Sequence, residues 1–225
     1  MNAPLIVAID GPAGAGKSTV ARGLAARLGV PYIDTGAMYR AIGLAARERG
    51  VTLPIGDAEA VAGIAENVRL GIELSPSGTR VSIDGRDVSE AIREPEISRY
   101  ASAVSAVPAV RRVLVREQQR LGRSGGGVME GRDIGTKVFP ETPFKFFLTA
   151  SPAVRAERRA RELAARGTPQ PYADVLSDMK RRDRDDSTRA ESPLTLDGGY
   201  VVIDSGGKSV DDVIGEMEAR VRAAG

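Results

Sequence analysis

Gly11-Pro-Ala-Gly-Ala-Gly16-Lys17-Ser18 is the stretch of sequence that decides the fold, because it matches the pattern G-x-x-x-x-G-K-[ST] at every position. The apolar run at residues 5–9 comes directly before it and is typical of a buried parallel strand. A helix is expected directly after it, over residues 18–28, and Gly29 marks the end of that helix. A glycine-rich turn that leads from a strand into a helix can hold phosphate groups with its backbone amides.

The loop offers a distinct role to each kind of residue in it. Its glycines let the backbone curl so that the amides face inward, while Lys17 can reach the β- and γ-phosphates of a nucleotide. Ser18 is placed to ligate Mg²⁺. A glycine-rich turn with a chance lysine is the structural alternative, and the correct flanking elements argue against it. A Rossmann dinucleotide site is excluded, since no G-x-G-x-x-G pattern fits these glycines. The residues expected to hold the donor nucleotide are Gly11, Pro12, Ala13, Gly14, Ala15, Gly16, Lys17, Ser18 and Thr19.

Outward from this loop, strand patterns and helical patterns alternate along the chain. Residues 30–33 predict a second strand and residues 35–49 a second helix. This β-α-β-α order indicates an α/β fold with a parallel sheet of five strands flanked by helices, of the P-loop NTPase type. The other strands of that sheet are expected at residues 128–129, 144–148 and 200–203, with helices at residues 94–104, 108–121 and 210–222.

Two regions depart from this alternation. Residues 56–93 are expected to form a small antiparallel insert, because two short apolar strands there are separated by turn residues. Residues 151–193 are polar and rich in arginine, and they predict a basic helix followed by one further helix. The expected parts of the insert are a helix over residues 57–68, strands at 70–74 and 80–83, and turns at 75–78 and 84–85.

Composition limits the chemistry that this chain can perform. Hydrophobic residues at 42% and charged residues at 28% indicate a folded globular protein of 225 residues. Cysteine and histidine are both absent from the sequence, which excludes disulfides, Cys/His metal sites and Ser-His-Asp catalysis. Chemistry must therefore depend on Asp, Glu, Lys, Arg, hydroxyls, backbone amides or a hard metal such as Mg²⁺. No secretion signal or membrane-spanning stretch is visible, so a cytoplasmic protein is expected.

A second motif, Asp34-Thr35-Gly36-Ala37-Met38-Tyr39-Arg40, follows the second predicted strand. Ligands of open α/β sheets bind beyond the carboxyl ends of the strands, so this turn is expected to lie beside the phosphate-binding loop. Arg40 can clamp the phosphate of an acceptor from there. The alternative is an N-capped helix whose arginine is merely solvated.

A third motif, Glu130-Gly131-Arg132-Asp133-Ile134-Gly135, follows the third parallel strand. Arg132 supplies a fork-shaped donor for phosphate and Asp133 an acceptor for a base amino group, so the two form a plausible recognition pair. Ser102 and Arg111 complete a candidate base pocket, although the sequence alone favours an interpretation of both as helix-surface residues. Glu130 and the glycine run at residues 125–127 have no interpretation from the sequence.

Together these stretches resemble the bacterial cytidylate kinase family, over nearly the whole chain. Residues 180–189, Lys-Arg-Arg-Asp-Arg-Asp-Asp-Ser-Thr-Arg, and the final strand before Ser205 also fit that family, as does the antiparallel insert. The resemblance implies an enzyme that transfers the γ-phosphoryl group of ATP to CMP or dCMP, with Mg²⁺, by direct in-line transfer. It also implies a monomer that binds no nucleic acid and no membrane.

The resemblance further implies a role for each matching residue. Ser102, Arg111 and Asp133 would read the cytosine, and Arg40 and Arg132 would grip the acceptor phosphate in the turn formed by Asp34, Thr35 and Tyr39. Arg182 and Asp186 would address that phosphate and the ribose. Arg158, Arg159 and Arg189 would approach the transferring group together with Lys17.

The basic helix over residues 151–166 becomes part of a lid in this interpretation. The alternative is a solvated charged helix, in which Arg155, Arg161 and Arg166 face only water. One kinase domain over residues 1–225 is expected, made of a core (about 1–55, 94–150 and 194–225), a monophosphate-binding insert (about 56–93) and a lid (about 151–193).

Two other functions stay open from the sequence. One is a different small-molecule P-loop kinase, for another monophosphate or for shikimate, which would not need the three base-reading residues. The other is a nucleotide-regulated RNA-binding protein, suggested by a pI of about 9.0 and by the arginine-rich runs. Aromatic residues make up only 4% of the chain and none interrupts the basic segments, so platforms for base stacking are lacking.

Overall fold

The computed structural model describes residues 4–75, 78–189 and 191–223. The glycine-rich loop lies where the sequence places it, between β1 (Ile6–Asp10) and α1 (Lys17–Leu28). Gly16 before the helix and Gly29 after it have φ angles of 91° and 67°. Glycine adopts this left-handed conformation without a steric penalty, which is why the helix starts and stops at these residues.

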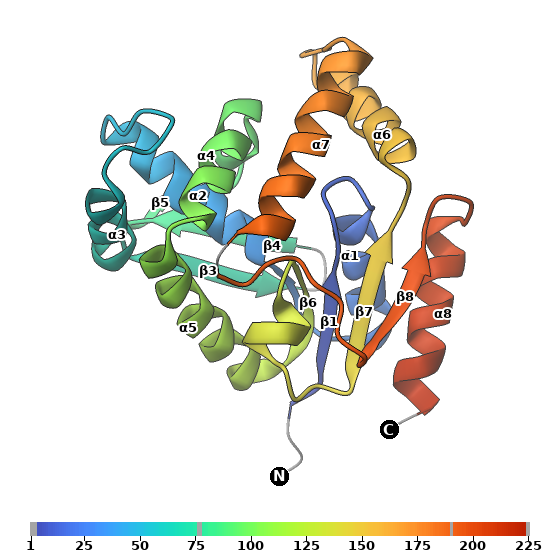
Figure 1. Cartoon of the computed structure of the whole chain (residues 1–225). Coiled ribbons are helices and arrows are strands. Elements are labelled where there is room, and N and C mark those ends of the chain that lie inside the picture. The colour runs from blue at the N-terminus through green and yellow to red at the C-terminus, as the bar shows by residue number, and fades with distance from the viewer. Residues whose placement is uncertain (1–3, 76–77, 190, 224–225) are drawn as a thin grey trace.

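Five parallel strands form the centre of the sheet, as predicted. They are ordered β2 (Tyr32–Asp34), β6 (Gly127–Gly131), β1, β7 (Phe144–Thr149) and β8 (Tyr200–Asp204). β6 is longer than the two residues expected and pairs with β1 along its whole length. All five carboxyl ends therefore meet at one edge, and the loops above that edge include the glycine-rich loop (Figure 1).

The predicted antiparallel insert is present and continues the main sheet. It consists of β3 (Leu70–Ser75), β4 (Gly78–Ile83) and β5 (Arg86–Asp87), and Tyr32 of β2 pairs with Ser75 of β3. The Thr79 hydroxyl donates to the Tyr32 carbonyl at 2.9 Å and strengthens this junction. Within the described residues the strands thus form one eight-stranded sheet. Residues 76–77 of the predicted turn lie outside the described residues.

β1 is buried on both faces along its whole length, which explains its continuous apolar run. Val7 and Ile9 of β1 lie on the face of the sheet that packs against α1 and α8 (Val210–Ala223). Ile6 and Ala8 lie on the opposite face. That opposite face is covered by α5 (Pro108–Gly125) and a π-helical turn, η2 (Ile134–Val138). α2 (Thr35–Glu48), α3 (Ala58–Asn67) and α4 (Pro95–Ser105) pack with α5 and β4 in a further cluster. The short 3₁₀ turn η1 (Ala91–Arg93) directly precedes α4 and contributes Ile92 to this cluster.

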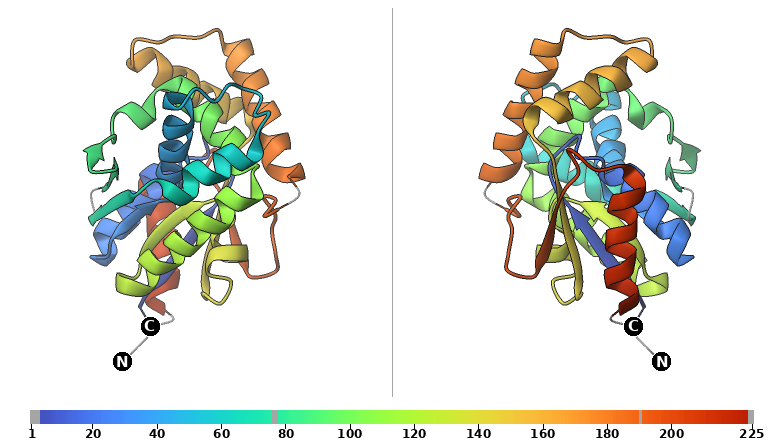
Figure 2. Two further views of the ribbon diagram at one scale, coloured as in Figure 1. Left: turned by 90° about the vertical axis from the view of Figure 1, so that its left-hand side faces the viewer. Right: turned by 90° about the vertical axis from the view of Figure 1, so that its right-hand side faces the viewer.

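Two helices, α6 (Pro152–Ala165) and α7 (Tyr172–Thr188), project above the loop edge of the sheet (Figures 1 and 2). They pack on each other through Ala156, Leu163, Val175 and Met179. They are the basic helix and the further helix that the sequence predicts. Among the helices of the described chain, none has the length and apolar character to span a membrane.

Candidate active site

One large cavity of about 970 Å³ opens at the loop edge of the sheet, between the core and the helices α6 and α7. A cavity of this size can hold small-molecule substrates and bury most of their surface. Gly11, Pro12 and Ala15 are the only predicted site residues that do not line it. Those that do are Ala13, Gly14, Gly16, Lys17, Ser18, Thr19, Asp34, Thr35, Tyr39, Arg40, Ser102, Arg111, Arg132, Asp133, Arg158, Arg159, Arg182, Asp186 and Arg189.

Lys17 is buried at the floor of this cavity, at the start of α1. Its Nζ donates to the carbonyl oxygen of Pro12 at 2.9 Å, across the glycine-rich loop. Burial, followed by the charge of the nearby Arg132, lowers the pKa of Lys17 to about 7, although the charge of Glu130 opposes this shift. An anionic phosphate in the loop would restore the charge of this lysine, because an opposite charge favours the ionised form.

Glu130, which the sequence left uninterpreted, is a buried carboxylate at the end of β6. It accepts a hydrogen bond from the Tyr32 hydroxyl. Burial, and then the charge of Asp34, raise the pKa of Glu130, while Lys17 and Ser18 oppose that rise. These contacts could not be recognised from the sequence, because the partners of Glu130 come from two other elements of the fold, α1 and β2.

The donor set around Ser18 fits Mg²⁺. Ser18 is exposed in the cavity, and its hydroxyl and the Glu130 carboxylate are hard oxygen donors of the kind that Mg²⁺ prefers. Across the described residues, no three or more Asp, Glu, His or Cys side chains gather into a potential metal site. Mg²⁺ is usually held by one or two protein oxygens together with substrate phosphates, so such a gathering is not required.

The acceptor turn is built on an N-cap. Asp34 accepts from the Ala37 amide at 2.9 Å and so begins α2, and its other oxygen pairs with Arg40 at 2.7 Å. The Thr35 hydroxyl donates to the Glu130 carbonyl at 2.7 Å and joins this turn to β6. Arg40 is therefore held inside the cavity wall and is not a freely solvated arginine. Its Nε is buried and has no partner within the described structure.

Arg111 and Asp133 come together on the buried wall of the cavity, although 22 residues separate them in the chain. The Arg111 guanidinium, 3% exposed, pairs with the Asp133 carboxylate and lies 5.6 Å from the centre of the Tyr39 ring. Ser102 lines the same cavity from α4. The three predicted base-reading residues thus face one space, from α4, α5 and the turn after β6.

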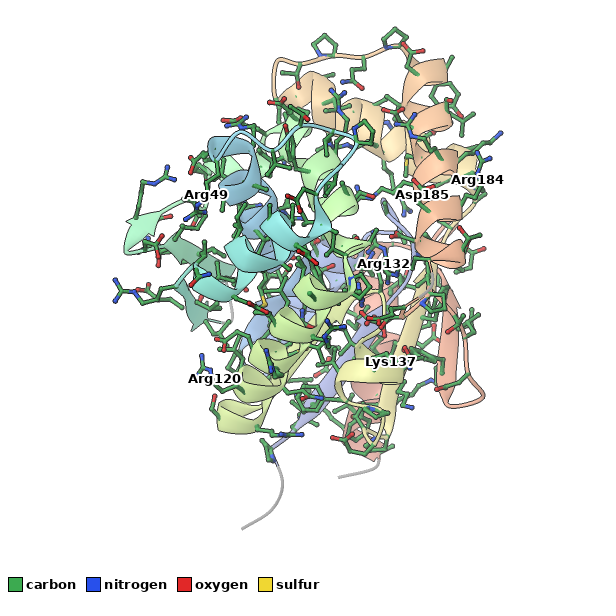
Figure 3. The ribbon with its side chains drawn as sticks, turned by 60° about the vertical axis from the view of Figure 1, so that its left-hand side comes forward. Arg49, Arg120, Arg132, Lys137, Arg184 and Asp185 are labelled. Carbon is green, nitrogen blue, oxygen red and sulfur yellow. The ribbon has the colours of Figure 1, made fainter. Side chains whose placement is uncertain are left out.

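Arginines gather around Asp186, near the C-terminal end of α7. Arg132 Nε donates to Asp186 at 2.7 Å and Arg189 lies 3.6 Å from it. In Figure 3 the labelled Arg132 lies just below the end of α7, where Asp185 is also labelled. Burial opposes the charge of Asp186, yet Arg132 and Arg182 hold its pKa below the usual range. Burial, with the nearby Arg132 and Arg40, lowers the pKa of Arg182 to about 10.

This cluster has more positive charge than Asp186 can balance. Arg182 Nε and one terminal nitrogen of Arg189 are buried and have no hydrogen-bond partner in the described structure. Unsatisfied, buried guanidinium donors are costly unless an anion approaches them. The cluster is therefore suited to a phosphate group, which has the charge and oxygens to satisfy these donors.

The lid arginines differ from one another in their surroundings. Arg158 donates to the Ser205 hydroxyl at 3.0 Å and to its carbonyl at 2.7 Å, and Arg159 pairs with Glu162 at 2.9 Å. Both line the cavity. Arg161 is exposed and pairs with Glu157, one turn away, which agrees with the solvated alternative for that residue.

The alternative in which Arg155 faces only water is wrong. Its side chain is buried and donates to the carbonyls of Ala150 and Ala13, each at 3.0 Å, and to Asp183 of α7 at 2.6 Å. One buried cation therefore joins the glycine-rich loop to both lid helices. Arg166 is also not only solvated, because it donates to the Arg93 carbonyl at 3.1 Å and so connects the end of α6 with η1.

A phosphate-binding loop and a second, arginine-lined anion site face each other in one cavity, which defines a P-loop phosphotransferase acting on two phosphorylated substrates. Residues 7–223 match the model of the cytidylate kinase family, described as "Cytidylate kinase", and the chain belongs to this family. Cytidylate kinases phosphorylate CMP and dCMP with ATP, so this chain is a nucleotide-binding kinase and ATP is its phosphoryl donor.

Known relatives agree with this assignment. A cytidylate kinase of Caldanaerobacter subterraneus subsp. tengcongensis is 46% identical over 222 residues, which cover 99% of this chain and 96% of the relative. A bifunctional pantoate ligase/cytidylate kinase of Synechococcus sp. is 47% identical over 92% of this chain, and the chain spans only 39% of its length. A solved structure, an uncharacterized protein from Eubacterium ventriosum, matches with a TM-score of 0.55 and 13% identity, covering 97% of this chain and 98% of that chain. That likeness concerns the fold alone.

Proposed function

We propose that the protein transfers the γ-phosphoryl group of ATP to CMP or dCMP, giving ADP and CDP or dCDP. The observation that carries this proposal is the buried Arg111–Asp133 pair, which opens into the same cavity as Lys17 of the glycine-rich loop. Asp133 can accept from the exocyclic amine of cytosine, while Arg111 and Ser102 donate to the ring acceptors. Uracil would place a carbonyl against Asp133 and be disfavoured.

The donor nucleotide would occupy the glycine-rich loop, residues 11–19. Its backbone amides and the N-terminus of α1 suit the phosphates, and Lys17 lies at the floor of the cavity beneath them. Ser18, with Glu130 nearby, would hold Mg²⁺, which when bound neutralises charge on the phosphate oxygens.

The acceptor phosphate would lie between Arg40, Arg132 and Arg182. The unpartnered Nε atoms of Arg40 and Arg182 and the lowered pKa of Arg182 support this assignment. Asp186 would address the ribose as well as hold Arg132. Asp34, Thr35 and Tyr39 would shape the wall beside the acceptor.

Phosphoryl transfer would depend on the alignment of the two nucleotides and on neutralisation of the negative charge on their phosphates. Arg158, Arg159 and Arg189 would approach the transferring group with Lys17. A general base is not needed, because the attacking oxygen belongs to an anionic phosphate. Closure of the lid over both nucleotides would exclude water and suppress hydrolysis of ATP.

We also propose that residues 1–225 act as one kinase domain with a core, a monophosphate-binding insert and a lid, at the boundaries predicted from the sequence. The protein is proposed to be a cytoplasmic monomer. Light scattering of the purified protein, with and without both nucleotides, tests the monomer directly.

A coupled ADP-release assay with Mg²⁺-ATP tests the proposed reaction. The acceptor panel is CMP, dCMP, UMP, AMP, GMP and shikimate. A strong preference for CMP and dCMP is the expected result. A preference for another acceptor would overturn the base-reading assignment but would not affect the proposed donor site. Rapid ATP hydrolysis without any acceptor would contradict the proposed closure of the lid.

A further inference from the structure

Asp10 is a fully buried carboxylate at the end of β1, immediately before the glycine-rich loop. The four other residues of this strand are apolar. A carboxylate is expensive to bury, so it needs partners that favour its charged form. Asp10 has three, and all of them come from outside β1.

Two of these partners are backbone amides of the turn after β6. The Ile134 amide donates to Asp10 Oδ1 at 3.0 Å and the Gly135 amide to Oδ2 at 2.9 Å. The third partner is the Tyr200 hydroxyl of β8, which donates to Oδ2 at 2.5 Å. Gly135 permits this arrangement, because a Cβ at that position would lie 2.7 Å from the Tyr200 hydroxyl.

The amides held by Asp10 belong to the residues directly after Arg132 and Asp133. The Asp133 carbonyl is itself fixed, since it accepts from the Lys137 amide at 2.9 Å and the Val138 amide at 3.2 Å. Asp10 on one side and η2 on the other thus fix the backbone that carries Arg132 and Asp133. These two side chains make the contacts to Asp186 and Arg111 on the cavity wall.

We propose that Asp10 is a positioning residue for the acceptor nucleotide, which holds the turn after β6 so that Asp133 meets the base and Arg132 meets the phosphate. The proposal rests on the acceptor roles proposed above for Asp133 and Arg132. It means that one residue of β1 sets the position of the turn after β6 relative to the glycine-rich loop, which begins at the next residue.

A carboxylate is required for this arrangement, because two amides need two acceptor oxygens at once. Asparagine has the same shape but would oppose its own NH₂ group to one of the two amides. Burial raises the pKa of Asp10 to about 6, the two amides and Tyr200 oppose the rise, and the charge of Asp133 adds to it. Burying the charged carboxylate of Asp10 costs free energy, and such costly groups occur often at functional sites.

The test uses Asp10→Asn in the full chain, with kcat and the KM of each nucleotide measured separately. We expect the KM for CMP to rise about tenfold, as for the loss of one hydrogen bond to a buried group, and the KM for ATP to change less than about twofold. The preference for CMP over UMP should narrow as well. Tyr200→Phe removes only one of the three bonds and should raise the KM for CMP by a smaller factor.

Thr142→Val is the matched control. The Thr142 hydroxyl is buried and donates to the Ile6 carbonyl at 2.6 Å, at the other end of the same strand. Its loss should lower the melting temperature without changing the KM for CMP. Asp133→Ala tests the proposed acceptor site itself, because that side chain would contact the base directly.

An unchanged KM for CMP in Asp10→Asn, or equal increases in both KM values, would overturn the positioning role. If Asp10→Asn does not fold, an unchanged KM for CMP in Tyr200→Phe would overturn it equally. If Asp133→Ala also leaves CMP binding unchanged, the acceptor site is wrong. If Asp133→Ala weakens CMP binding and Asp10→Asn does not, only the role of Asp10 fails.

Discussion

The Arg111 guanidinium is paired with the Asp133 carboxylate on the buried wall of the cavity, while its Nε is buried and has no hydrogen-bond partner in the described structure. A base that enters this site must therefore form its hydrogen bonds with two side chains that are already paired with each other. The pair has fixed charge and fixed direction, because Asp133 lies in a turn held from both sides and Arg111 lies over the Tyr39 ring. Preformed polar groups of this kind discriminate between ligands more strongly than apolar contacts do.

Asp133→Asn should therefore lower kcat/KM for CMP by about a hundredfold and narrow the preference for CMP over UMP by at least about tenfold. The asparagine amide can donate to the uracil carbonyl, which the native carboxylate cannot do. Steady-state kinetics with both acceptors measure the change. Glu117→Gln, which breaks an exposed pair with Arg120 on the same helix as Arg111, serves as the control and should behave as wild type. An unchanged ratio of CMP to UMP activity would rule Asp133 out as the reader of the base.

Arg155→Ala should detach the glycine-rich loop from the lid. It removes the donors to Ala13 and Ala150 and leaves Asp183 without its ion-pair partner. We expect the free energy of unfolding to fall by about 3 kcal/mol, as when a buried ion pair loses one member, and the KM for ATP to rise. Chemical denaturation and steady-state kinetics measure the two effects.

Arg161→Ala is the control for this variant, because Arg161 lies on the same helix and forms only an exposed pair with Glu157. Its effect on stability should stay below about 1 kcal/mol, and its kinetics should match those of wild type. Equal effects of the two substitutions would show that the buried contacts of Arg155 contribute nothing specific.

Elements whose signals lie within a short stretch of the chain could be predicted from the sequence. β1, the glycine-rich loop and α1 follow from one apolar run and one motif, and the ends of α1 follow from Gly16 and Gly29. The junction of the insert with the main sheet could not be predicted, since the pairing of Tyr32 with Ser75 joins residues 43 positions apart. Short strands carry too little pattern to specify such a register.

The same division holds for the candidate site. Lys17 and Ser18 follow from the motif, whereas Arg111 and Asp133 formed only a candidate base pocket until the resemblance to a family implied that they read the cytosine. Asp10 and Arg155 have buried side chains, yet a charged residue in a sequence is normally assigned to the surface. Their partners lie on elements far along the chain, so their burial can be recognised only in the fold.

Gly126→Ala should destabilise the protein, which gives a physical reason for part of the glycine run before β6. Gly126 has a φ of 69°, and a Cβ there would lie 2.5 Å from the Leu5 carbonyl oxygen. We expect a loss of at least about 2 kcal/mol in the free energy of unfolding. Gly125→Ala is the control, since a Cβ at Gly125 meets nothing within 4 Å and alanine favours the end of α5. If both variants were equally stable, close approach of the backbone at Gly126 would not explain the glycine.

Lys17→Met should reduce kcat by at least about a hundredfold and yet raise the melting temperature at pH 6. Burial lowers the pKa of Lys17 to about 7 in the folded protein, against 10.5 in the unfolded chain. Between these values the unfolded chain binds the extra proton, so this lysine makes stability rise with pH through the window and fall as pH drops towards 7. Methionine has no charge to bury, so the gain in stability of the variant should be largest at and below pH 7 and shrink towards pH 10. Calorimetry of both proteins from pH 6 to pH 10 measures this difference. A variant that is less stable than wild type across the whole range would mean that the bond from Nζ to the Pro12 carbonyl outweighs the cost of burying the ammonium group.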